Sequence, residues 1–238
     1  FKGKTKAGPH GDFIYEMDHI VGELMKTLEQ NGLAKNTLII FTSDNGPEVP
    51  TTIAMRRDHK HDGARPWRGV KRDNWEGGHR VPFIARWPGK IPAGRTATQT
   101  ICLTDLFATT AAITEFKLPN NAGEDSFNLL PALLGGQEPV REYTLHQTIS
   151  LALAIRHGDW KYLDHRGSGG NNYARTGEWG MKQFALPEKA PSAPGQLYNL
   201  KTDPGETTNL YLEETERALT LKAKLEEFKR TARSAPNR

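Results

Sequence analysis

The stretch Thr37-Leu38-Ile39-Ile40-Phe41-Thr42-Ser43-Asp44-Asn45-Gly46 decides how the rest of the chain is interpreted. Its apolar run predicts a strand over 37–42 that is buried on both faces, and Ser-Asp-Asn-Gly predicts a tight turn at its end. Asp44 and Asn45 then lie at the carboxyl end of a central strand, where open α/β sheets bind ligands. Their two oxygen donors suit a hard cation such as Ca²⁺ or Mg²⁺. The alternative is a turn that only reverses the chain, since such sequences are common in turns.

The composition excludes some classes of protein. The chain has 238 residues, of which 36% are hydrophobic and 25% charged, enough for one large domain or two smaller ones. The net charge of +4 is mildly basic and does not by itself indicate nucleic-acid binding. No apolar run approaches the length of a membrane span, and a single cysteine excludes an intramolecular disulfide. Because the chain starts with neither Met nor an apolar secretory segment, we expect a truncation or processing product.

The first half of the chain predicts a helix, two short strands and two loops. Apolar residues recur at helical spacing from Ile14 to Leu28, after a predicted loop over 1–12. A helix followed by a buried strand is half of a βαβ unit, so we expect the preceding strand upstream of this sequence. Residues 47–80 predict a long polar loop, and Val81 to Trp87 predict a second short buried strand.

The pattern changes from Tyr143 onward to short strand-like runs joined by turns. His157-Gly158-Asp159 is typical of a hairpin turn, and a helix is predicted at about 213–233. This half therefore predicts a small antiparallel sheet that carries a C-terminal helix. The predicted strands are 150–156, 160–163 and 195–200, and the predicted units are 1–140 and 141–238.

A lysine and a Glu-Gly-Gly motif follow the first predicted strand. Lys71 lies five residues before Glu76-Gly77-Gly78-His79-Arg80-Val81-Pro82, which leads into the second apolar strand. This order and spacing, together with Ser43-Asp44-Asn45-Gly46 upstream, resembles the arylsulfatase-like sulfatases of the alkaline-phosphatase-like superfamily. The resemblance covers nearly the whole chain, but only the later part of a sulfatase. It implies an α/β fold, with part of a central sheet flanked by helices and then the small antiparallel sheet.

The resemblance also implies roles for particular residues. Asp44 and Asn45 are expected to bind Ca²⁺, with Mg²⁺ as the alternative metal. Lys71 is expected to be a catalytic residue that binds the sulfate group, and His79 a second substrate-binding residue. The substrate is expected to be a sulfated small molecule or a sulfated polysaccharide.

The nucleophile of such an enzyme is not recognised in this sequence. Sulfatases use a formylglycine made from Cys or Ser in a Cys/Ser-x-Pro-x-Arg motif. Cys102 lacks Pro and Arg at that spacing and is predicted to be a packing residue. We therefore expect the formylglycine in a missing N-terminal half, which would be the partner of this chain. The chain alone is expected to be inactive, and a periplasmic or secreted location follows from the resemblance only.

Two other functions remain open. One is a phosphodiesterase or phosphomonoesterase of the same superfamily, although the Glu-Gly-Gly-x-Arg-x-Pro run with Lys71 upstream favours a sulfatase. The other is a non-catalytic binder of acidic polysaccharide or nucleic acid that uses the basic loop 47–80. Only Trp67 and Trp75 are aromatic in that loop, and no nucleic-acid-binding motif is recognised, which argues against nucleic acid.

Overall fold

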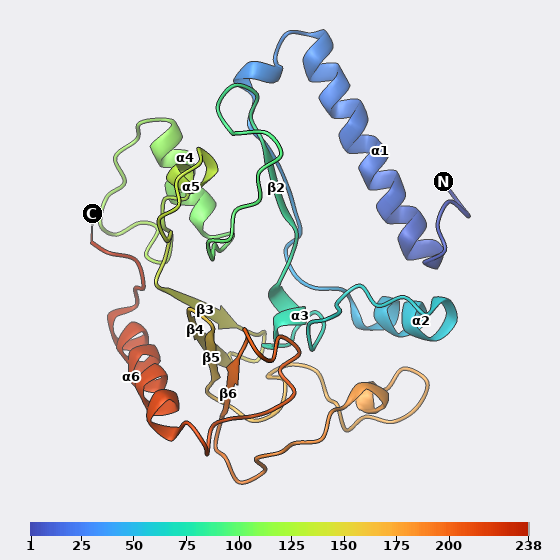
Figure 1. Cartoon of the computed structure of the whole chain (residues 1–238), viewed down its shortest axis with the longest axis vertical. Coiled ribbons are helices and arrows are strands. Elements are labelled where there is room, and N and C mark those ends of the chain that lie inside the picture. The colour runs from blue at the N-terminus through green and yellow to red at the C-terminus, as the bar shows by residue number, and fades with distance from the viewer. Residues whose placement is uncertain (238) are drawn as a thin grey trace.

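The computed structural model describes residues 1–237 and confirms the predicted α/β class. Figure 1 shows a long N-terminal helix beside a two-stranded ladder, and a separate four-stranded sheet flanked by the C-terminal helix. The helices are α1 (Gly8–Gln30), η1 (Ala34–Asn36), α2 (Val49–His59), α3 (Glu76–His79), α4 (Asp105–Ile113), α5 (Leu130–Leu133), η2 (Met181–Phe184) and α6 (Thr215–Thr231). The strands are β1 (Ile39–Thr42), β2 (Phe83–Arg86), β3 (Tyr143–Gln147), β4 (Leu153–His157), β5 (Trp160–Leu163) and β6 (Gln196–Asn199).

The two-stranded sheet carries the stretch that organises the chain. β1 pairs with β2 in antiparallel fashion, with Ile40 opposite Ala85. The prediction that this strand is buried on both faces is wrong, because all four residues of β1 remain partly exposed. β1 has one paired neighbour among the described residues, and no residue of α1 is buried, so neither face is fully covered.

The four-stranded sheet follows the predicted hairpin pattern. Its order is β3-β4-β5-β6, and all three pairings are antiparallel. Ile155, Tyr162 and Leu197 are buried in one cluster with Leu221 and Leu225 of α6. α6 therefore packs its apolar residues against this sheet, and Figure 1 shows the helix lying beside it. The strand β3 was not predicted. It is the edge strand of the sheet and pairs with β4.

Two predicted loops contain helices. α1 begins at Gly8, within the predicted loop 1–12, because Pro9 fits the first turn of a helix. Residues 49–59 of the predicted loop 47–80 form α2, whose first turn also holds a proline. The Glu48 side chain accepts a hydrogen bond from Val49 N, and Ile53 and Met55 are buried. Across residues 1–237, none of the helices combines the length and apolar composition needed to cross a bilayer.

Candidate functional site

The turn after β1 is packed directly against α3. Gly46 N donates to Gly78 O at 2.9 Å, and Lys71 N donates to Pro47 O at 2.9 Å. A Cβ at Gly46 would lie 1.8 Å from Gly77 O, so no other residue fits without a shift of the backbone. Two backbone hydrogen bonds and one close approach therefore join the Asp44-Asn45 turn to the segment that carries Lys71 and His79.

We expect Gly46→Ala to destabilise the protein and separate these two segments. The added methyl group meets backbone atoms that have no rotamer to move to, so the free energy of unfolding should fall by about 3 kcal/mol, the upper end of typical overpacking costs. Chemical denaturation measures this loss. Gly22→Ala is the matched control, because a Cβ at Gly22 in α1 meets nothing within 4 Å and alanine favours a helix. Equal stability of Gly46→Ala and wild type would contradict the close packing of Gly46 against Gly77.

The side chains of Asp44 and Asn45 offer oxygen donors at this turn. Asp44 is exposed, and no hydrogen bond or ion pair to its carboxylate is found within residues 1–237. Asn45 Nδ2 donates to Gly46 O at 2.9 Å, which leaves its amide oxygen available as an acceptor. A carboxylate next to a carboxamide oxygen fits the chemistry of Ca²⁺ or Mg²⁺, although two ligands are fewer than either ion requires.

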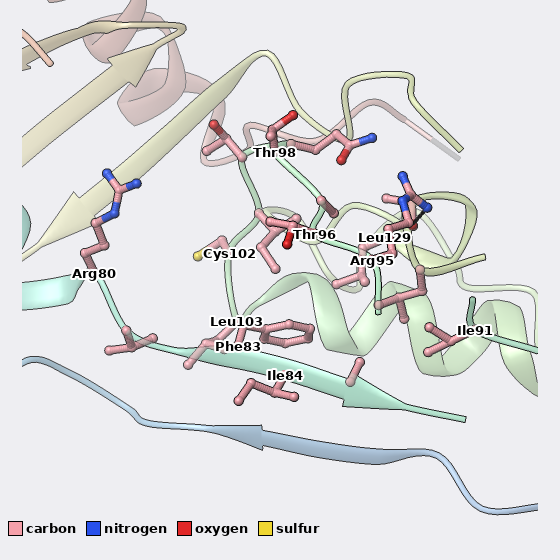
Figure 2. Close-up of a pocket in the computed structure, with 18 of the residues that line it drawn as sticks. Arg80, Phe83, Ile84, Ile91, Arg95, Thr96, Thr98, Cys102, Leu103 and Leu129 are labelled. Atoms are coloured by element: carbon pink, nitrogen blue, oxygen red, sulfur yellow. Dashed lines mark hydrogen bonds between the residues drawn. The ribbon is translucent and has the colours of Figure 1, made fainter. Parts of the chain in front are cut away.

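Asp44 also lies on the wall of a large cavity of about 1210 Å³. The cavity wall includes Glu76, His79, His146 and Arg156, and one side of it is formed by β2. Figure 2 shows Arg80 at one end of this cavity and Phe83 of β2 farther along its wall. Arg80 Nη1 lies 3.2 Å from Glu76 Oε2, so this arginine anchors α3 by an ion pair.

Lys71 is not among the cavity-lining residues of the described chain. Its Nζ is 3.5 Å from Glu48 Oε2, and its side chain is 36% exposed. Glu48 is held mainly by Arg72, which donates two hydrogen bonds of 2.6 and 2.9 Å. These hydrogen bonds from Arg72 lower the pKa of Glu48 to about 2. Lys71 therefore keeps an accessible charge, with only a long contact to an already paired carboxylate.

The loop that carries Lys71 is fixed by a buried aspartate. Asp73 Oδ2 accepts hydrogen bonds from Val70 N at 2.9 Å and from the Tyr173 hydroxyl at 2.6 Å. Asp73 Oδ1 accepts from Asn171 Nδ2 at 2.8 Å, and the same amide nitrogen donates to Lys71 O at 2.8 Å. The excursion between β5 and β6 thus holds the backbone of Lys71 in place. Sequence analysis missed this link, because its partners lie about a hundred residues apart.

A buried ion cluster, made of Glu76, Lys161 and Glu206, joins α3 to the four-stranded sheet. Lys161 Nζ lies 2.9 Å from Glu76 Oε1 and 3.1 Å from Glu206 Oε1, and all three side chains are at most 2% exposed. Glu206 Oε2 also accepts from Glu76 N at 2.6 Å. Glu206 Oε1 makes an ion-pair contact only and has no hydrogen-bond partner in the described chain. No motif in the sequence predicted this cluster.

Two histidines lie beside the buried ion cluster. The rings of His79 and His146 stack with centroids 3.7 Å apart. Burial, helped by repulsion from neighbouring cations, lowers the pKa of His79 well below its ordinary value and that of His146 to about 3. Glu76, His79 and His146 each bring one ligand atom within 4.8 Å of the others. Lys161 Nζ already lies 2.9 Å from both Glu76 Oε1 and His79 Nε2, so an ammonium group takes the cation position there.

Glu206 gives the stability of the protein a pH dependence. Burial raises the pKa of Glu206 from its ordinary 4.5 to about 7, although Lys161 opposes the shift. A raised pKa means that the folded state binds the proton more tightly, so this contribution is complete below about pH 4.5 and is lost as pH rises through about 7.

We expect Glu206→Gln to remove the fall in stability between about pH 4.5 and 7 that this carboxyl causes. Thermal unfolding of wild type and variant across this pH range measures the difference in slope. Glu188→Gln is the control, because Glu188 is an exposed carboxylate of the same half of the chain. Parallel stability curves for Glu206→Gln and wild type would show that this carboxyl titrates normally.

Comparison with known proteins identifies the family of this chain. The family model "Sulfatase" matches residues 5–116. An N-acetylgalactosamine-6-O-sulfatase of Bacteroides thetaiotaomicron is 35% identical over 232 residues, covering 96% of this chain and 43% of that protein. This chain belongs to the sulfatase family. Human steryl-sulfatase is 37% identical over 158 residues, covering 66% of the chain and 27% of that enzyme.

A solved structure of a related protein has the same fold as this sulfatase chain. A Bacteroides thetaiotaomicron protein, described in connection with the metabolism of multiple glycosaminoglycans, superposes with a TM-score of 0.79 at 33% identity. The superposition covers 96% of this chain and 46% of that structure. The chain therefore spans less than half the length of the relatives that it matches.

Proposed function

We propose that this chain supplies the metal-binding turn and the sulfate-binding lysine of an enzyme that hydrolyses sulfate esters. The observation that carries the proposal is the pair of backbone hydrogen bonds, Gly46 N to Gly78 O and Lys71 N to Pro47 O. They hold the Asp44-Asn45 turn against the segment that carries Lys71 and His79. A cation site and a cationic side chain are thus provided by two adjacent segments, as binding of an anionic ester requires.

Each residue has one part in the proposed chemistry. Asp44 and Asn45 hold the divalent cation, and the neutral carboxamide limits the negative charge that would repel the substrate. When bound, the metal neutralises charge that develops on the sulfuryl oxygens. Lys71 places a second positive charge on the same group, and the neutral ring of His79 donates a hydrogen bond. The sulfate group binds beside the Asp44-Asn45 turn, at the edge of the cavity that Asp44 lines.

The remaining parts of the active site belong to other segments in this proposal. The nucleophile is a formylglycine outside these 238 residues, and so are the further metal ligands. Cys102, half-buried ahead of α4, is not the nucleophile. The substrate class that we favour is a sulfated saccharide, because the related Bacteroides protein is an N-acetylgalactosamine-6-O-sulfatase. A periplasmic or extracellular location fits such a polymeric substrate.

The test is turnover of an aryl sulfate by this chain alone and by the full-length enzyme that contains it. We expect calcium- or magnesium-dependent turnover in the full-length enzyme, loss of that turnover with a chelator, and none from the chain alone. Cys102→Ser in the full-length enzyme should keep full turnover. Strong activity of the isolated chain, or loss of activity in a folded Cys102→Ser variant, would place the nucleophile within this chain and overturn the proposal. Faster turnover of an aryl phosphate would favour a phosphatase instead.

A further inference from the structure

Lys161 lies at the centre of the buried ion cluster. It stands on β5 with a side-chain exposure of 0%. Its Nζ lies 2.9 Å from Glu76 Oε1, 2.9 Å from His79 Nε2 and 3.1 Å from Glu206 Oε1. Two of these contacts are hydrogen bonds, to Glu76 and His79, and the third is an ion pair with Glu206, so the charge of Lys161 is fully used inside the protein. Lys161 therefore cannot reach a substrate and acts on its neighbours.

The contact with His79 fixes where that ring carries its proton. An ammonium group only donates hydrogen bonds, so Nε2 of His79 has to accept with its lone pair. The same Nε2 lies 3.2 Å from Asn74 O. That carbonyl oxygen only accepts, so it would form a hydrogen bond with a protonated Nε2 and not with an unprotonated one. Because Nε2 accepts from Lys161, the proton of the neutral ring is on Nδ1. His146 stacks on the face of the ring and offers no hydrogen bond in its plane.

We propose that Lys161 is a positioning residue, whose buried ammonium group holds His79 as the Nδ1–H tautomer and so makes that ring a hydrogen-bond donor to a sulfate ester oxygen. This inference rests on the proposed function, because it names how His79 contributes to the same site. His79 and Asp44 both line this cavity, so the ring borders the same space as the candidate metal turn. Through Glu76, Lys161 also holds α3, the helix that follows Lys71 in the chain.

The tautomer of His79 can be measured directly. In the chain labelled with ¹⁵N-histidine, we expect the His79 signals of a neutral ring with a protonated Nδ1 and an unprotonated Nε2. His79→Gln assigns these signals among the eight histidines. A protonated Nε2 in the wild-type chain would overturn the proposal without any further variant.

Lys161→Met separates positioning from simple packing. Without the ammonium donor, Nε2–H can donate to Asn74 O, so we expect the ring to switch to the Nε2–H tautomer. Lys222→Met is the matched control, because Lys222 is 44% exposed on α6 and should leave the tautomer unchanged. If Lys161→Met does not fold, Glu206→Gln tests the inference from the opposite side. It disturbs the buried ion cluster but keeps the Lys161–His79 contact, so the ring should remain the Nδ1–H tautomer. An unchanged tautomer in folded Lys161→Met, or a switched tautomer in Glu206→Gln, would contradict the inference.

Turnover by the full-length enzyme completes the test. We expect folded Lys161→Met to lower kcat/KM on an aryl sulfate about 10²-fold, the effect of a misplaced active-site group. A variant with the switched tautomer and wild-type kcat/KM would refute the positioning role. If the wild-type enzyme instead shows no sulfate-ester turnover, the proposed function fails, while the tautomer measurement on His79 stands by itself.

Discussion

Lys71→Ala should lower the turnover of an aryl sulfate by the full-length enzyme about 10²- to 10³-fold, the usual cost of removing one preorganised electrostatic group. The side chain carries an accessible charge, and its ion-pair contact with Glu48 is 3.5 Å long. Glu48 keeps its two hydrogen bonds from Arg72 in the variant, so the fold around the loop should survive. The loss should therefore appear in kcat/KM with little change in thermal stability.

Two further variants sharpen this test. Lys117→Ala removes an exposed lysine after α4 and should leave turnover unchanged. Lys71→Arg keeps the positive charge but replaces a compact ammonium with a longer planar group, so only partial recovery is expected. If Lys71→Ala turned over substrate within about threefold of wild type, Lys71 would not be a sulfate-binding residue, and the role implied by its spacing from Glu76 would be wrong.

Glu76→Gln should lower the free energy of unfolding by about 3 kcal/mol, the lower end of the cost of breaking a buried ion pair. Glu76 is 1% exposed and is shared by Lys161, Arg80 and Arg156. The substitution leaves the ammonium of Lys161 buried, with Glu206 as its one carboxylate partner among residues 1–237. Ionisation of Glu206 can replace part of the lost charge, which places the expected cost at the lower end of that range.

The stability of Glu76→Gln as a function of pH provides a second measurement. Burial alone would raise the pKa of Glu76, but Lys161, His79 and His146 together more than offset it, so this pKa lies below its ordinary value of 4.5. Its contribution to stability is therefore present above about pH 4.5 and lost as pH falls, and Glu76→Gln should lose less stability in acid than wild type does. Glu226→Gln, on the exposed face of α6, is the control and should cost less than about 1 kcal/mol. An equally small cost for Glu76→Gln would show that the buried ion cluster does not stabilise the fold.

Local patterns predicted much of the fold. The hairpin turn His157-Gly158-Asp159 and the alternation around it correctly placed β4 and β5, because strands joined by short turns leave a strong local signal. α2 was missed because its residues are mostly polar and its apolar stripe is short. The burial of β1 was overestimated, because burial depends on which elements cover a strand and not only on its own apolar residues.

The candidate site was predictable only where its residues are close in sequence. Asp44, Asn45, Lys71 and His79 were all selected from motifs, and their roles remain proposals. Lys161 and Glu206 were not selected, because their role depends on contacts with Glu76 across 85 and 130 residues. A buried lysine between two glutamates leaves no signal in one sequence, since each residue alone is typical of a solvated surface.

The most direct test of the central claim is a crystal structure of the full-length enzyme with Ca²⁺ and a sulfated saccharide or inorganic sulfate bound. We predict a cation held by Asp44 and the amide oxygen of Asn45, with a sulfate oxygen within hydrogen-bonding distance of Lys71 Nζ. A cation held instead by Glu76, His79 and His146, with Asp44 left in solvent and Lys71 away from the sulfate, would contradict it.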